Sequence, residues 1–223
     1  MELSKSILVL LLFSCLLSFS TEATWIAFGP AANSPSPSPI KYDLLPHIPC
    51  KSLFSTAYNN PFKLPKSINP SLDNICAITE NPANCVTLIS PCVTGSINSF
   101  SALEAVMISL IEHVQNALSF ALKLRKNKST SSEILTAINI SIDIYVEIIE
   151  DLRKALGAFK GHNIDTVKTI LTASITNFGR CDEAFHQQGL TKNWPLKKID
   201  NILIELAGFG LDIYAKLIVK VHN

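Results

Sequence analysis

Cysteines are the residues of this chain best suited to covalent chemistry, and two of them are spaced for an intrachain disulfide bond. Cys76 and Cys85 enclose the segment CAITENPANC, in which Asn81-Pro82 predicts a break between two short helices. Closing this loop of ten residues would stabilise the fold by roughly 2 to 3 kcal/mol, because it restricts the unfolded chain. We therefore predict a Cys76–Cys85 bond, the alternative being that neither cysteine is bonded to the other.

The start of the chain bears on the redox environment of these cysteines. Residues 1–23 contain Lys5, the apolar run ILVLLLFSCLLSF and the small residues Thr21 and Ala23, which is the pattern of a signal peptide. The run is shorter than the roughly 20 residues that cross a bilayer, and no later stretch is both long enough and free of charge. We expect a secreted or vacuolar protein with no membrane span. Disulfides form in such oxidising compartments.

The chain lacks the motifs that would assemble an active site. HExxH, CxxC, a glycine-rich phosphate loop and a nucleophile elbow are absent, and the histidines show no metal-ligand spacing. Cys181 lies on an apolar helical stripe, where a thiol is disfavoured from ionising. The formal net charge is +1, and about +2 without the signal peptide, which is too close to neutral for general binding of nucleic acids. We expect a protein that is not an enzyme and that binds no cofactor, metal or nucleic acid.

The chain after the signal peptide divides into a proline- and serine-rich extension and a helical domain. Residues 24–67 include the run SPSPSP and show no sustained hydrophobic period, so we expect an extended segment. Residues 68–223 begin with the cysteine hairpin, where Ser71 or Asp73 is the expected N-cap, and continue with helical patterns.

Four long segments carry apolar residues at alternating steps of three and four, the spacing of one face of a helix. We expect helices over residues 99–126, 132–159 and 163–188, and from Pro195 to about residue 221. Short connections make consecutive helices antiparallel neighbours, which predicts an all-α, up-down-up-down four-helix bundle preceded by the disulfide-stapled hairpin. The inward stripes are Leu103, Val106, Leu110, Val114, Ala117 and Ala121; Ile138, Ser141, Tyr145, Ile148, Leu152, Ala155 and Phe159; Ile164, Val167, Leu171, Ser174, Phe178, Cys181 and Phe185; and Leu196, Ile199, Leu203, Leu206, Gly210, Ile213, Leu217 and Val221.

The order of several motifs resembles the plant invertase and pectin methylesterase inhibitor family. The motifs are the Cys-x8-Cys hairpin with ITENPANC, then IYVEIIEDLRKALGAF, DTVKTILTASITNFGRCDEAF and PLKKIDNILIELAGFGLDIY. The similarity covers residues 68–221. It implies a secreted four-helix bundle with one disulfide in the hairpin and a second between the second and third long helices.

One position departs from the family pattern. The family has a cysteine four residues before the tyrosine of the second long helix, whereas this chain has Ser141 before Tyr145; the expected partner, Cys181, is present. The core stripes independently place Ser141 and Cys181 on facing surfaces. The resemblance thus implies the loss of a bridge around a loop of about 41 residues, which would contribute roughly 4 kcal/mol.

Five cysteines follow the signal peptide, so at least one has no partner within the chain. Cys50 and Cys92 are additional to the family pattern. They can bond to each other, which leaves Cys181 as the free thiol, and a Cys92–Cys181 bond is the alternative. A bond from Cys50 to another molecule would instead give a disulfide-linked dimer.

The resemblance implies an inhibitor that covers the active-site cleft of a cell-wall or vacuolar carbohydrate enzyme, chiefly with its second and third long helices. Outward positions on these helices are the interface candidates, the alternative being that they form an ordinary solvated face. The candidates are Asp143, Glu147, Glu150, Asp151, Thr172, Thr176 and Arg180.

Two target enzymes are compatible with the resemblance. Invertase inhibitors of the family commonly carry Pro-Lys-Phe before the third long helix, where this chain has FKGHNIDTVKTIL. The segment TILTASITNFGRC instead resembles the threonine-rich stretch of pectin methylesterase inhibitors. We therefore favour pectin methylesterase over acid invertase as the partner. A non-inhibitory structural protein of the cell wall is the alternative from another class, and a lipid carrier fits less well because its closely spaced cysteines are absent.

Two sequons predict sites of N-glycosylation. Asn127 lies at the expected turn between the first two long helices and is the better acceptor. Asn139 lies within a predicted helix beside the core stripe, so we expect it to stay unmodified.

Overall fold

The computed structural model describes residue 50 and residues 69–190 and 194–221, all within one compact unit, residues 46–223. The predicted signal peptide, and the proline-rich extension apart from Cys50, lie outside the described residues. The side chains of residues 220 and 221 lie outside them as well, so the inward placement of Val221 stays a prediction.

A short helical hairpin begins the described fold. Helix α3 spans Pro70–Cys76, helix α4 spans Pro82–Ile89, and a 3-10 turn follows at Ser90–Cys92. The predicted N-cap of α3 was wrong: Asn69 caps this helix, and its Oδ1 accepts a hydrogen bond from the Ser71 amide at 3.1 Å. Asn81 caps α4 and Pro82 occupies its first turn, so the Asn-Pro pair starts the second helix, whereas α3 already ends at Cys76.

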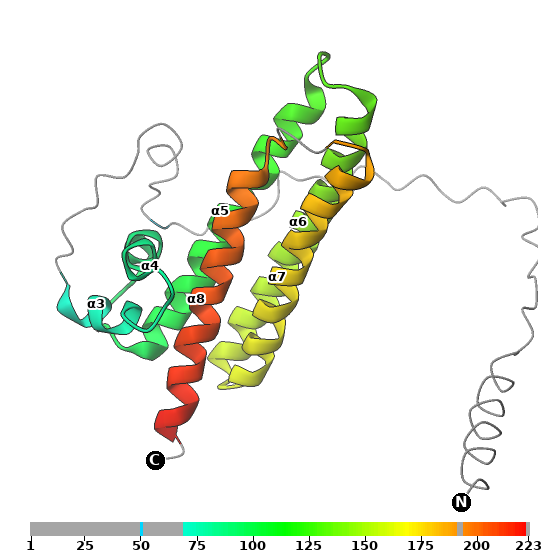
Figure 1. Ribbon diagram of the computed structural model, residues 1–223. Coiled ribbons are helices and arrows are strands. Elements are labelled where there is room, and N and C mark those ends of the chain that lie inside the picture. The colour runs from blue at the N-terminus through cyan, green and yellow to red at the C-terminus, as the bar shows by residue number, and fades with distance from the viewer. Residues whose placement is uncertain (1–49, 51–68, 191–193, 222–223) are drawn as a thin grey trace, which may run out of the picture. The chain divides into compact units, whose positions relative to one another are not determined.

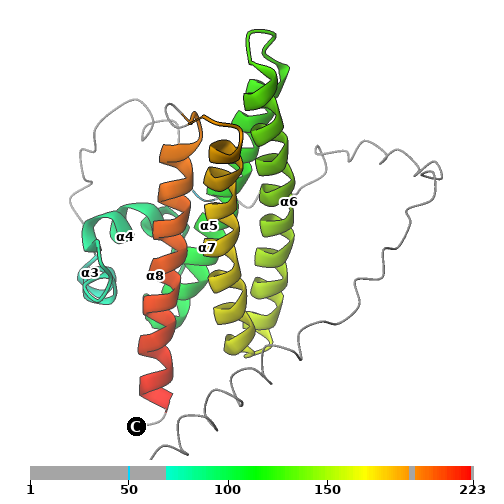
Figure 2. The same ribbon diagram turned by 45° about the vertical axis from the view of Figure 1, so that its right-hand side comes forward.

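Four long helices form the body of the molecule (Figure 1). They are α5 (Ser99–Lys126), α6 (Ser132–Lys160), α7 (Ile164–Gln187) and α8 (Lys197–Val221). Helix α5 packs against α6 and α8, and α7 packs against the same two helices, which is the cyclic neighbour order of an up-down-up-down bundle. The hairpin of α3 and α4 lies against α5 and α8 (Figure 2). The structure confirms the predicted fold class.

The predicted stripes form the core of the bundle. Every predicted inward position on α5 and α6 is buried, and so are those on α7 and those described on α8, except Ile164. Ile164 is half-buried because it is the first residue of α7, at the end of the bundle. Gly210 serves close helix packing, since a Cβ atom there would lie 2.7 Å from Cδ1 of Leu171 and 3.1 Å from Cγ1 of Val106.

Helix α5 is, by length and composition, the one helix among the described residues that could cross a membrane. Its most apolar window is 61% buried inside the bundle, in contact with α6 and α8. Core packing therefore accounts for its apolar character.

Candidate functional site

Two disulfide bonds join the cysteines near the start of the described fold. Cys76 and Cys85 connect α3 to α4, as predicted, and Cys50 is bonded to Cys92. Cys181 is a buried free thiol, so the alternative Cys92–Cys181 pairing was wrong. The sulfur of Cys50 is used within the chain, which also contradicts the suggested dimer through this residue.

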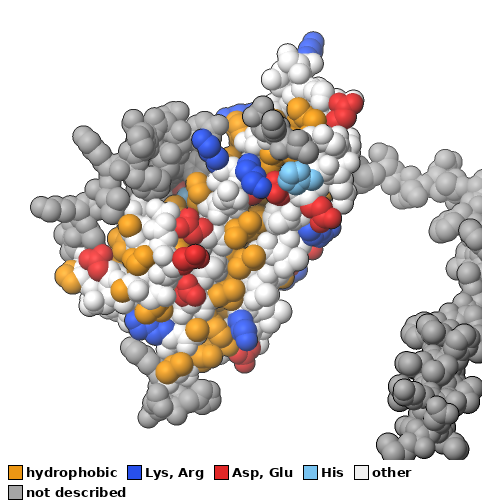
Figure 3. Space-filling model, viewed as in Figure 1, with side chains coloured by type: hydrophobic (Ala, Val, Ile, Leu, Met, Phe, Trp, Pro, Cys, Tyr) orange, Lys and Arg blue, Asp and Glu red, His pale blue; other side chains and the backbone are white. Residues whose placement is uncertain are grey.

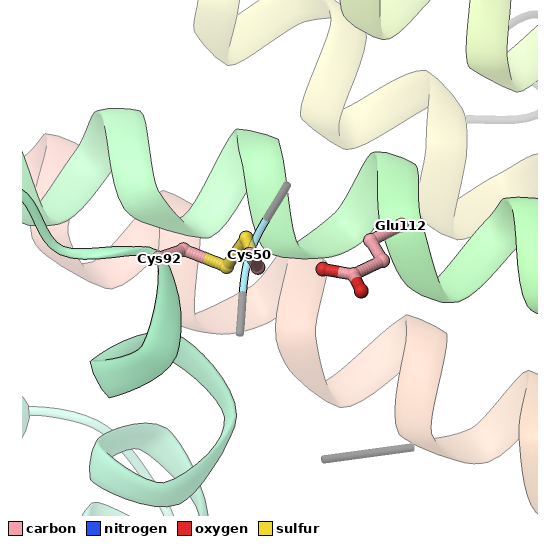
Figure 4. A group of neighbouring side chains, drawn as sticks. All are labelled: Cys50, Cys92 and Glu112. Atoms are coloured by element: carbon pink, nitrogen blue, oxygen red, sulfur yellow. A yellow bond between two sulfur atoms is a disulfide. The ribbon is translucent and has the colours of Figure 1, made fainter. Parts of the chain in front are cut away.

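Glu112 lies beside the Cys50–Cys92 bond (Figure 4). The potential ligand atoms of Cys50, Cys92 and Glu112 all lie within 4.8 Å of one another, and the three residues are buried. Metal ions bind cysteine as the thiolate, and these two sulfur atoms are bonded to each other. We therefore assign no metal site to this group.

A polar cluster lies inside the bundle where α6, α7 and α8 meet. Ser141 and Cys181 are both fully buried and their side chains lie close together, as the facing stripes predicted. Each donates to a backbone carbonyl of its own helix, Ser141 to Ala137 at 3.1 Å and Cys181 to Asn177 at 3.9 Å. Burial and the nearby charge of Asp200 raise the pKa of the Cys181 thiol to about 12. The thiol is therefore protonated at physiological pH and is a poor nucleophile.

Asp200 is the acceptor of this cluster. The Tyr145 hydroxyl donates to its Oδ1 at 2.5 Å, and Trp194 Nε1 donates to its Oδ2 at 3.0 Å. Burial raises the pKa of Asp200 to about 6, although the two hydrogen bonds oppose this shift. Burial and the carboxylate also raise the pKa of Tyr145 far above its usual value. These hydrogen bonds join α6, α8 and the segment before α8, so the cluster stabilises the packing of the bundle.

The acidic interface candidates lie on the outer surface of α6. Asp143, Glu147 and Glu150 are exposed, and Asp151 is half-buried. Asp151 forms an ion pair with Lys154 at 2.8 Å, one turn along the same helix. The outer side of α6 is therefore a solvated row of carboxylates with one paired member.

The remaining candidates, Thr172, Thr176 and Arg180, are exposed on α7, the helix that packs beside α6. Each threonine hydroxyl donates to a backbone carbonyl four residues earlier, at 2.9 Å for Thr172 and 3.4 Å for Thr176. This bond fixes the hydroxyl hydrogen and leaves its oxygen free to accept. Arg180 donates to Asn177 Oδ1 at 3.2 Å.

A shallow depression of about 530 Å³ lies along this part of α7. Sequence reasoning missed four of its lining residues: Asp165, Lys168, Thr169 and Ala173. Asp165, Lys168 and Thr169 precede Thr172 by seven, four and three residues, which are helical spacings and could have indicated them. Tyr214 of α8 donates to Asp165 Oδ1 at 2.6 Å, which fixes one end of the depression.

We call the α6 carboxylates, the α7 candidates and the depression together the α6–α7 face. Within it, the described side chains offer carboxylates, hydroxyl acceptors and cationic groups, without a nucleophile held by a base. Such a surface can bind another molecule through shape, charge and hydrogen bonds.

Comparison with known proteins identifies the fold family. The family model described as plant invertase/pectin methylesterase inhibitor matches residues 70–213, more than half of the chain. The chain belongs to this inhibitor family. The match begins at the first residue of α3 and ends within α8, so it includes the hairpin as well as the bundle.

Two individual proteins are similar to this chain. It is 22% identical over 152 residues to the putative pectinesterase/pectinesterase inhibitor 26 of Arabidopsis thaliana, an alignment that covers 63% of this chain. The chain spans only 16% of the length of that curated relative. A crystal structure of a mutant form of a pectin methylesterase inhibitor from Arabidopsis matches with a TM-score of 0.55 and 15% identity, covering 66% of this chain and 97% of that one. At this identity, the second likeness shows the shared fold.

The predicted glycosylation sites are both at the surface of this family member. Asn127 is exposed at the end of α5, and its Oδ1 accepts a hydrogen bond from the Ser129 amide at 3.0 Å. Asn139 is exposed on α6, so burial does not protect it. Its helical backbone remains the reason to expect that it stays unmodified.

Proposed function

We propose that this inhibitor-family protein blocks a cell-wall carbohydrate enzyme, and that pectin methylesterase is its target. In this proposal the α6–α7 face covers the active-site cleft of the enzyme. Secretion to the cell wall, with the vacuole as the alternative destination, belongs to the same proposal because the inhibitor must meet its target there.

The observation that carries the proposal is that the carboxylates of α6 and the threonine-lined depression of α7 lie on two helices packed side by side. Long helices held by a buried core present this surface from a fixed backbone. A pre-organised surface loses little conformational entropy on binding, and shape and charge are sufficient for inhibition.

Acid invertase is the second candidate target, because the family also includes inhibitors of invertase. The turn before α7 consists of Gly161, His162 and Asn163, and the amide of Asn163 donates to the Ala158 carbonyl at 2.9 Å. This compact turn has no Pro-Lys-Phe motif, which supports the preference for pectin methylesterase.

An inhibition panel tests the proposal. The secreted protein at micromolar concentration is added near pH 6 to a plant pectin methylesterase and, in parallel, to an acid invertase. Selective loss of esterase activity supports the proposal, and loss of invertase activity alone reverses the choice of target. If both enzymes keep full activity, inhibition is refuted and a structural role in the cell wall becomes the better hypothesis.

A further inference from the structure

A groove lies on another side of the bundle, along α8. It has a volume of about 370 Å³ and is lined by residues of α7, α8 and the turn between α3 and α4. Its lining residues are Glu80, Ile175, Asn201, Ile204, Glu205, Gly208, Phe209 and Asp212. On the face formed by α7 and α8, acidic side chains lie in a column beside hydrophobic ones (Figure 3). The groove therefore combines an apolar wall with an acidic wall.

The acidic wall holds three carboxylates, from Glu80, Glu205 and Asp212, and no Lys, Arg or His is among the lining residues. Glu205 is positioned by Asn84, whose Nδ2 donates to both carboxylate oxygens at 3.0 and 3.2 Å. An amide orients this carboxylate without neutralising its charge. Desolvation and the charge of Glu80 raise the pKa of Asp212, so the groove concentrates negative potential.

Gly208 keeps the groove open. A glycine inside a helix costs about 0.5 to 1 kcal/mol relative to alanine, and such residues often permit a close approach of another group. A Cβ atom on Gly208 would meet nothing within 4 Å, so packing within this protein does not require glycine there. Gly210, two residues further along, is enclosed by Leu171 and Val106. The two glycines differ because Gly208 lines open space.

We propose that this groove binds a segment of a partner protein that presents a Lys or Arg side chain beside an aliphatic one. The aliphatic group would pack against Ile175 and Ile204 over Gly208, and the cation would pair with Glu205 and Asp212. Acidic polysaccharide is disfavoured as the occupant because its carboxylates would be repelled. The groove and the α6–α7 face share no residue, so this inference does not depend on the proposed function.

A labelled peptide tests the charge requirement. The probe is a fluorescein-labelled peptide in which Arg and Leu alternate between glycines, with Glu in place of Arg in the control peptide. Fluorescence anisotropy with the full chain should show binding of the Arg peptide alone, weakened by added salt. The double variant Glu205→Gln/Asp212→Asn should bind about tenfold more weakly, because two partly exposed ion pairs are lost.

A control variant with the same change in net charge distinguishes binding in the groove from general electrostatic attraction between the peptide and the protein. Glu133→Gln/Glu183→Gln removes two exposed carboxylates that lie neither in the groove nor on the α6–α7 face, and it should leave peptide affinity unchanged. Gly208→Leu should weaken binding by filling the groove, with circular dichroism confirming its helical content. Equal affinity for all three variants, or no binding by the natural sequence, would overturn the proposal. Self-association that disappears in Glu205→Gln/Asp212→Asn would also overturn it, because a second copy would then be the occupant.

Discussion

The Tyr145 hydroxyl of α6 lies 2.5 Å from Oδ1 of Asp200, a carboxylate buried at the start of α8. Trp194 supplies a second donor from the segment before α8. One carboxyl group thus links two long helices and the connection that leads into one of them. Its protonation is coupled to the stability of the whole bundle.

The first prediction concerns pH. Asp200 has a pKa of about 6 in the folded protein and an ordinary value of 3.8, so folding favours its protonated form. Its contribution to stability is therefore complete below pH 4 and is lost as the pH rises through about 6, a change of up to about 3 kcal/mol. Urea unfolding between pH 4 and pH 7 measures this change. Asp200→Asn should flatten the dependence, and an unchanged pH slope in that variant would contradict the assignment.

The second prediction compares two cysteines. Cys76→Ser opens the disulfide between α3 and α4 and should lower the free energy of unfolding by roughly 2 to 3 kcal/mol. Cys181→Ser removes a thiol that forms no disulfide and should change stability much less. Urea titrations of both variants make the comparison. Equal midpoints would refute the stabilising role of the hairpin disulfide.

The third prediction restores the bridge that this chain lacks. The side chains of Ser141 and Cys181 lie close together in the core, so Ser141→Cys should form a disulfide with Cys181 under oxidising conditions. The new bond would close about 41 residues and raise the free energy of unfolding by up to roughly 4 kcal/mol. Non-reducing peptide mapping and urea unfolding with and without a reductant test this. Two cysteines that both remain reactive after unfolding in denaturant would show that the bond did not form.

The fourth prediction uses the two glycines of α8. Gly210→Ala places a methyl group against Leu171 and Val106 and should destabilise the bundle by about 1 to 3 kcal/mol. Gly208→Ala meets open space and should stabilise the helix by about 0.5 to 1 kcal/mol. Thermal denaturation of the two variants should therefore shift in opposite directions. Shifts of the same sign would contradict the packing described for Gly210.

The bundle could be predicted from the sequence because each helix carries its own inward stripe. From Ile138 to Phe159 the apolar positions recur at steps of three and four, which depends on local sequence alone. The same local argument placed Ser141 and Cys181 opposite each other. The end of a stripe is less certain, as Ile164 shows, because the burial of a terminal residue depends on the neighbouring helices.

Interactions between distant segments could not be predicted in this way. No sequence pattern indicated that Asp200 is buried, and its hydrogen-bond partner Tyr145 lies 55 positions earlier in the chain. The pairing of Cys50 with Cys92 spans 42 positions and remained one of several possibilities. The bond from Asn84 to Glu205 joins residues 121 positions apart and left no periodic signal in the sequence. Each of these contacts exists only once the helices have packed.

The most direct test of the central claim is an inhibition titration of pectin methylesterase with variants of the α6–α7 face. Thr172→Lys/Thr176→Lys changes the depression on α7, and Ser119→Lys places the same side chain at an exposed position on α5, where the serine makes a similar hydrogen bond to its own helix. We predict that the natural sequence and Ser119→Lys inhibit equally, and that the double variant inhibits at least about tenfold more weakly, as for truncated interface anchors. Equal inhibition by all three proteins would contradict docking through this face.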